Sequence, residues 1–228
     1  MKVFIDAGHN CSGADTGALA NGLLEQDVNF YVARLLGEGL SKSGAEILYS
    51  RENLTDNIGT SVAESISKRC DMANAAKADL FISIHCNSAS TPDACGTETL
   101  IFSKGGEAER LAKEINKNIR ELGLADRGVK VRTNLGVLKN TTMPAVIVEL
   151  AFISNQSDAV FLKNCQKELA DSICRGVLEY AGMGVHWAEK YYYWLILGGM
   201  NIAEKRLDEP VTRGEMFKLL AMIKGFKE

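Results

Sequence analysis

No stretch of the 228-residue sequence approaches the roughly 18 consecutive apolar residues that a membrane-spanning helix needs. Proline is scarce, and three prolines with 21 glycines are too few for a collagen-like chain. The hydrophobic fraction of 46% and the charged fraction of 24% are those of an ordinary folded protein, which excludes a disordered class. The length suits one α/β domain with a small appendage.

An excess of basic residues is also missing, because the formal net charge is -3. Proteins that bind nucleic acids in general usually carry a basic stripe, so we expect no nucleic-acid partner. The first residues, MKVFIDAGHN, begin an apparent strand at once and contain no apolar core followed by a small-residue cleavage site. We therefore expect synthesis in the cytoplasm without a signal peptide, and no membrane partner.

The six cysteines form no CxxC pair and have no regular spacing. Free thiols in a reducing compartment are therefore the expectation. Cys11 lies close to His9 in the sequence and Cys86 directly follows His85, and both histidines are considered below as metal ligands. Strand alternation points the Cys86 side chain away from His85. We assign neither cysteine a role in metal binding.

The first 180 residues alternate short apolar strands with amphipathic helices, which predicts an α/β fold with helices on a largely parallel or mixed sheet. The predicted strands are Lys2–Ala7, Glu46–Ser50, Leu80–His85, Thr97–Phe102, Gly136–Leu138 and Ala145–Leu150. Apolar residues at helical spacing predict helices over 28–40, 64–78, 111–122 and 169–180.

The sequence changes character after Gly182. Both tryptophans, Trp187 and Trp194, lie in this last part, and Thr212 followed by Glu215 has the spacing of a capping box. We expect residues 1–182 to form the main domain and 183–228 a small all-α segment of two helices. Such a segment is too short for a robust core of its own. It packs either on the first domain or on a copy of itself, so the oligomeric state stays open.

Two of the three histidines stand at predicted strand ends. His9 follows the strand 2–7 and His85 ends the strand 80–85, and ligands of α/β sheets bind beyond the carboxyl ends of strands. Glu149 is the only charge in the apolar run 145–150, where a lone carboxylate is costly unless it is paired or used. Glu25 opens the first helix, close to the loop that His9 begins. The third histidine, His186, lies beyond the glycine break and is interpreted as structural.

Imidazole and carboxylate together form the ligand set of catalytic zinc, and a second carboxylate can then act as a general base. Each residue alone has a plainer explanation. A histidine at a strand end is more often structural, Glu25 suits a helix start, and Glu149 could pair with a buried arginine such as Arg51. The joint placement of the four residues favours a zinc hydrolase.

Several motifs resemble, in one collinear order over residues 2–180, the zinc-dependent N-acetylmuramoyl-L-alanine amidase family. The resemblance begins with Asp6–His9 and Gly22–Glu25 and continues through Ser50–Arg51 and Arg69. It ends with Ser83–Ser88, Gly96–Thr99 and Val148–Asn155. Ala151 and Cys11–Ser12 depart from the glycines that are usual in the family, and none of these is a proposed ligand.

By position, the resemblance implies that His9, Glu25 and His85 bind Zn²⁺ and that Glu149 is the catalytic base. It also implies a twisted, mostly parallel six-stranded sheet with helices on both faces. The reaction implied is hydrolysis of the amide bond between N-acetylmuramic acid and L-alanine in bacterial peptidoglycan. Nothing in the sequence identifies a separate oxyanion donor, and Asn87 and Arg51 are candidate substrate-binding residues.

The tail, with Gly198–Gly199 and Val211–Glu215, resembles one S-layer-homology repeat, which implies a secondary wall polymer as a second partner. A helical hairpin packed on the first domain explains these residues equally well. A wall hydrolase with a small wall-binding tail and no signal peptide resembles a bacteriophage endolysin that acts at the cell wall. A host autolysin stays open as the alternative.

Three rival functions remain. A zinc carboxypeptidase would share the metal and differ in its products. A non-enzymatic wall-binding protein is disfavoured by the intact set of four residues. A surface-layer component is suggested by the tail alone.

Overall fold

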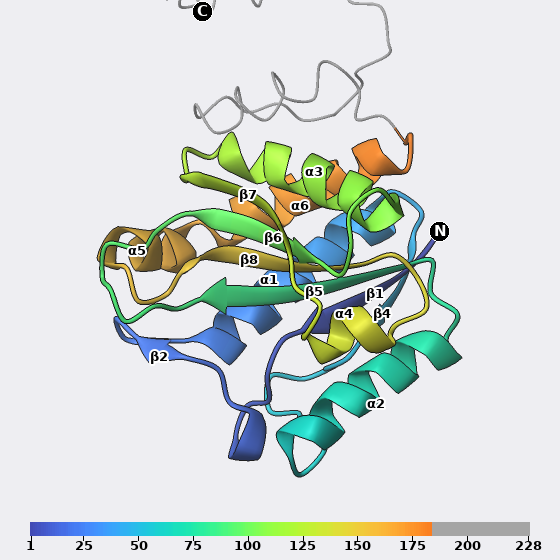
Figure 1. Ribbon diagram of the computed structural model, residues 1–228, viewed down its shortest axis with the longest axis horizontal. Helices are drawn as coiled ribbons and strands as arrows, with labels where there is room; N and C mark the ends of the chain where they lie inside the picture. Colours follow the sequence, from blue (N-terminus) through green and yellow to red (C-terminus); the bar gives the residue numbers. More distant parts are fainter. Residues whose placement is uncertain (184–228) are drawn as a thin grey trace, which may run out of the picture. The chain divides into compact units, whose positions relative to one another are not determined.

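Six strands form one mixed sheet, and helices cover both of its faces (Figure 1). The computed structural model describes residues 1–183, which form one compact unit. Apart from Met183, the predicted helical segment 183–228 lies outside the described residues, and so does His186. The predicted fold class, a mostly parallel six-stranded α/β sheet, is confirmed for residues 1–183.

The sheet is parallel except where β6 meets β8. Its order from edge to edge is β4 (Glu46–Tyr49), β1 (Lys2–Ala7), β5 (Leu80–Asn87), β8 (Ala145–Phe152), β6 (Thr97–Ile101) and β7 (Asp126–Val131). A separate short pair, β2 (Leu19–Ala20) and β3 (Leu23–Leu24), leads into the first helix.

Three helices cover one face of the sheet, and two cover the other (Figure 1). The first face carries α1 (Glu25–Lys42), α3 (Glu107–Arg120) and α6 (Gln166–Tyr180), and the second carries α2 (Val62–Ala75) and α4 (Gly136–Asn140). Helix α5 (Gln156–Asn164) follows β8, and one 3-10 turn, η1 (Gly13–Asp15), follows β1.

Strand alternation gives each face its own core. In β1, Val3 and Ile5 join the large apolar cluster beneath α1, α3 and α6, while Phe4 joins the smaller cluster with α2 and α4. Towards the carboxyl ends of β1 and β5, the second face turns polar, with the buried side chains of Asp6 and Ser83. Polar chemistry therefore gathers at one end of one face.

One predicted strand is wrong, one strand of the six-stranded sheet was not predicted, and neither was the short pair β2 and β3. Residues 136–138 begin the short helix α4, because three apolar residues after a glycine are too few to distinguish a strand from one helical turn. The sixth strand is β7, with the sequence DRGVKV, an edge strand whose residues are partly or fully exposed. Its polar composition hides the period-2 pattern that reveals half-buried strands.

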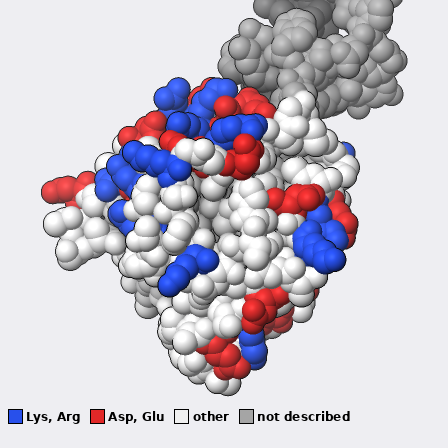
Figure 2. Space-filling model, turned by 45° about the vertical axis from the view of Figure 1, so that its right-hand side comes forward, with Lys and Arg blue, Asp and Glu red and all other residues white. Residues whose placement is uncertain are grey.

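Among residues 1–183, no helix is both long and apolar enough to cross a membrane. Charges of both signs lie side by side on the surface. They are densest in the upper part of Figure 2, at the same height as α3 in Figure 1. On that helix, Arg110 pairs with Glu107 and Lys113 with Glu109. All six cysteines lie within the described residues and are free, as expected.

Candidate metal centre

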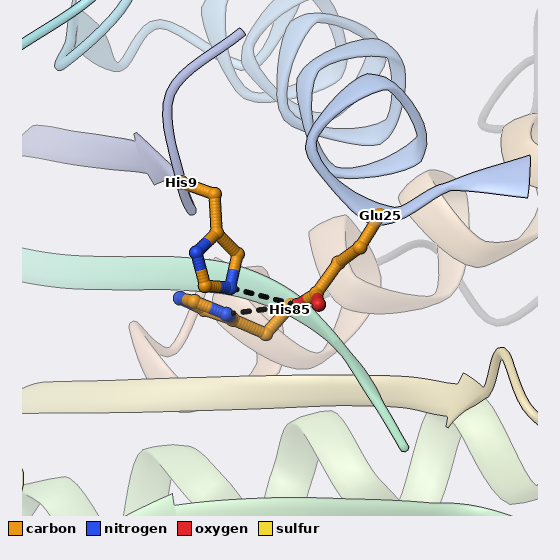
Figure 3. A group of neighbouring side chains, drawn as sticks. All are labelled: His9, Glu25 and His85. Atoms are coloured by element: carbon orange, nitrogen blue, oxygen red, sulfur yellow. Dashed lines mark hydrogen bonds and ion pairs between the residues drawn. The ribbon is translucent and has the colours of Figure 1, made fainter. Parts of the chain in front are cut away.

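Three side chains from distant parts of the sequence converge beyond the carboxyl ends of β1 and β5 (Figure 3). His9 comes from the loop after β1, Glu25 from the first turn of α1, and His85 from β5. One ligand atom from each lies within 4.8 Å of the others. The structure thus brings together the three residues that the sequence predicts as metal ligands.

Glu25 stands between the two imidazoles. Its Oε1 lies 3.2 Å from His9 Nε2 and 3.1 Å from His85 Nδ1. The same oxygen accepts a hydrogen bond from the Cys86 backbone N–H at 3.1 Å, and Oε2 accepts one from the Ala18 N–H at 2.8 Å. These backbone donors and the start of helix α1 hold the carboxylate in place and favour its negative charge.

The electrostatics of the three groups reinforce one another. Burial opposes ionisation of Glu25, but hydrogen bonds and charge interactions with His85 and His9 hold the pKa of this carboxyl well below its usual range. Burial likewise opposes the charge on His9, yet its contacts with Asp15 and Glu25 raise its pKa to about 9. A site that attracts positive charge this strongly is one in which a cation can replace the protons.

Backbone geometry makes room for the ligands. His9 adopts a φ of 66°, a left-handed conformation that is uncommon outside glycine and is typical of functional sites. At Gly8, an added Cβ would lie 2.3 Å from His85 Nε2, and at Gly17 it would lie 2.8 Å from Glu25 Oε2. Only glycine at these two positions leaves the ligand side chains where they are.

Glu149 lies beside His85, one of the three candidate ligands. On β8 it is the register partner of His85 on β5 and of Glu98 on β6, so the three side chains project from the same face. The residue as a whole is half-buried, and its Oε2 is enclosed and has no hydrogen-bond partner among the described residues. Burial raises the pKa of Glu149 to about 7, although the His85 charge opposes the rise. Such a carboxyl can accept and release a proton near neutral pH.

Glu98 is a second acidic residue that sequence reasoning did not select as a site residue, although it lies within one of the matching motifs. It is buried, and its two oxygens accept hydrogen bonds from Asn87 Nδ2 at 3.0 Å and Arg127 Nε at 2.9 Å. Asn87, a predicted substrate contact, therefore stands at the site with its amide turned to Glu98. Its contact with substrate stays a prediction.

Arg51, the other predicted substrate contact, has a different place in the structure. Its side chain is fully buried, and its guanidinium donates to the carbonyl oxygens of Ala7, Gly8, Gln26 and Leu54. It pairs neither with Glu149 nor with any other carboxylate of residues 1–183. Arg51 thus fastens the loops behind the candidate ligands, and its buried guanidinium is closed to substrate.

Comparisons with known proteins identify the family. Residues 3–179 match the N-acetylmuramoyl-L-alanine amidase family. Amidase LytC of Bacillus subtilis is 38% identical over 183 residues, which cover 78% of this chain and 35% of LytC. The endolysin of Bacillus phage SPP1 is 36% identical over 188 residues, covering 78% of this chain and 65% of the endolysin.

A solved structure shares the fold. The N-acetylmuramoyl-L-alanine amidase of Clostridium difficile 630 superposes with a TM-score of 0.71 at 31% identity, over 79% of this chain and 96% of that one. The family match over residues 3–179 includes His9, Glu25, His85 and Glu149. The chain belongs to the N-acetylmuramoyl-L-alanine amidase family.

Proposed function

We propose that the protein hydrolyses the amide bond between N-acetylmuramic acid and L-alanine in bacterial peptidoglycan, with zinc held by His9, Glu25 and His85. The observation that carries the proposal is the convergence of these three side chains, with Glu149 beside His85. Family membership supports the reaction and the substrate. Since the chain spans only about a third of LytC, we offer the activity of the whole protein as a proposal.

The three residues suit a zinc ion. Two imidazoles and one carboxylate are a ligand set of catalytic zinc. Two ligands about 2.0–2.2 Å from a tetrahedral ion lie roughly 3.3–3.6 Å apart, and the carboxylate oxygen here lies 3.2 and 3.1 Å from the two imidazole nitrogens. Zinc bound there would supply Lewis-acid polarisation of the scissile carbonyl and make a water more acidic.

The protein's own part in the reaction falls to Glu149. The residue is half-buried and its carboxyl forms no ion pair within residues 1–183, so we assign it the role of taking the proton of the attacking water. The same carboxyl then delivers this proton to the nitrogen of the departing L-alanine. Sheet pairing of β5, β8 and β6 fixes the positions of His85, Glu149 and Glu98 relative to one another. The Glu149 carboxyl therefore projects from the same place during both transfers.

Product analysis tests the proposal against a zinc carboxypeptidase, which would share the metal. We expect mass spectrometry of digested cell walls to show glycans with free lactyl-muramic acid and peptides that begin with L-alanine. A chelator should abolish both products, and added Zn²⁺ should restore them. Release of single amino acids from peptide ends, with the muramyl amide intact, would contradict the proposal.

The finer proposal is a role as a bacteriophage endolysin in host lysis, which the similarity to the SPP1 endolysin supports. LytC and a germination-specific amidase of Bacillus subtilis are about as similar, so an autolysin is the alternative. An endolysin expressed in the cytoplasm should leave cells intact until a holin breaches the membrane, whereas lysis without a holin would contradict this role. The wall-polymer binding suggested for the tail lies outside the described residues and stays a prediction.

A further inference from the structure

The nitrogen of His9 that faces away from Glu25 has a partner of its own. His9 Nδ1 lies 3.2 Å from Oδ1 of Asp15, the last residue of η1, while Nε2 faces Glu25. In metal sites, a carboxylate that accepts from the second ring nitrogen fixes the tautomer and the orientation of a ligating histidine. The Asp15 carboxylate therefore favours the tautomer with hydrogen on Nδ1, which leaves the Nε2 lone pair facing the other two ligands.

Asp15 is itself held from behind. Its Oδ2 accepts a hydrogen bond from Ser65 Oγ at 2.5 Å, and Ser65 is fully buried on α2. The Ser65 oxygen in turn accepts from Arg69 Nε at 3.1 Å, one helical turn further along. Both oxygens of Asp15 are thus engaged, one by the ligand and one by the helix.

Arg69 also contacts the backbone of His9. Its guanidinium donates to the His9 carbonyl oxygen at 2.7 Å and is ion-paired with Asp6 at 2.5 Å, and the side chains of both charged residues are almost wholly buried. One helix therefore fixes His9 twice, at its backbone through Arg69 and at its ring through Ser65 and Asp15. Each step of this path is a direct contact between protein groups.

We propose that Asp15 is a positioning residue of the metal site, anchored by Ser65, which presents His9 Nε2 to the zinc. The inference rests on the proposed function, because it concerns the same ion. It adds that α2, which supplies no ligand, takes part in metal affinity through side-chain contacts alone. Asp15 contacts the ligand and not the substrate, so its removal acts on zinc affinity directly and on turnover only as a consequence.

Zinc affinity, measured by competition with a chromogenic chelator at fixed pH, tests this inference without any assay of turnover. Groups that hydrogen-bond to metal ligands typically contribute about 10- to 100-fold in metal affinity. We expect Asp15→Ala to bind zinc about 10- to 100-fold more weakly than the wild type. Asp15→Asn keeps an acceptor oxygen and should lose clearly less. Asp27→Asn removes the same charge from the first turn of α1 and should bind zinc like the wild type.

Urea unfolding of the zinc-free proteins separates a folding defect from a binding defect. Should Asp15→Ala fail to fold, Ser65→Ala decides, since it withdraws the anchor while leaving His9 and Asp15 in place. We expect a several-fold loss of affinity in that variant. Wild-type affinity in folded Asp15→Ala, or in Ser65→Ala when the first variant is unfolded, would overturn the inference. Absence of zinc binding by the wild type would instead overturn the proposed function.

Discussion

Replacing Glu149 with glutamine is expected to lower amide hydrolysis about 100- to 10,000-fold while the protein keeps its zinc. Glutamine preserves the size of the side chain, and its amide cannot take a proton from water and pass it to the leaving nitrogen. Glu149 is not among the three grouped ligand residues, so metal binding should survive. The measurements are the initial rate of wall solubilisation and the zinc content by elemental analysis.

Glu46→Gln is the matched control for this variant. Glu46 is exposed at the amino end of β4, whereas Glu149 lies near the carboxyl end of the sheet, so turnover should not change. Near-normal turnover by Glu149→Gln with unchanged zinc would remove Glu149 from the mechanism. Loss of zinc together with activity would instead make it a ligand.

Replacing Arg69 with methionine is expected to lower the free energy of unfolding by about 3–5 kcal/mol, the usual cost of removing one partner of a buried ion pair. The change would leave the Asp6 carboxylate buried without its countercharge. It would also withdraw donors from the carbonyl oxygens of Ala7 and His9. Urea unfolding at neutral pH of zinc-free protein is the appropriate measurement, because bound metal would add its own stabilisation.

The pH dependence of stability provides an independent check on the Asp6–Arg69 pair. Burial alone would raise the pKa of Asp6, but the Arg69 charge and hydrogen bonds from Ser83 and Ser50 outweigh it, so the pKa is lowered. A carboxyl whose pKa is lower in the folded than in the unfolded protein stabilises the fold. This stabilisation is fully present above the unfolded-state pKa of about 3.9. This stability is lost as the pH falls through the folded-state pKa.

The difference between wild type and Arg69→Met should therefore be largest near neutral pH and shrink as the pH falls, beginning above about pH 4, because the buried and unpaired Asp6 of the variant has a raised pKa and takes up its proton first. Asp6→Asn in the Arg69→Met background should recover part of the loss, because it removes the unpaired charge. A difference that does not vary between pH 7 and pH 3 would show that the pair contributes no linked stability.

The buried strands could be predicted from the sequence because their apolar runs are dense. Lys2–Ala7 was predicted with its observed bounds, and the run 145–150 lies within β8. The edge strand β7 was not predicted because its residues are mostly polar and partly or fully exposed. Helix α5 was also missed, since its short sequence QSDAVFLKN presents few residues to the core.

The placement of His9, Glu25, His85 and Glu149 near one end of the sheet could be predicted because strand ends, a helix start and a lone charge are local features. Their roles come from the family resemblance and stay predictions. The support around them depends on contacts between distant residues. Asp15 and Ser65 are 50 positions apart, and Asp6 and Arg69 are 63 apart. One signal was present in the sequence, since Ser65 and Arg69 share a face of α2, and an arginine in a buried position requires a partner. Nothing in the sequence alone identified Asp6 as that partner.

Zinc content, measured on the purified wild type and on His85→Ala, tests the central claim most directly. We expect one zinc per wild-type chain at a fixed protein concentration, and almost none in His85→Ala, because a carboxylate and one imidazole are too few protein ligands for a stable catalytic site. A wild-type protein without zinc, or a folded His85→Ala protein that retains a full equivalent, would contradict it.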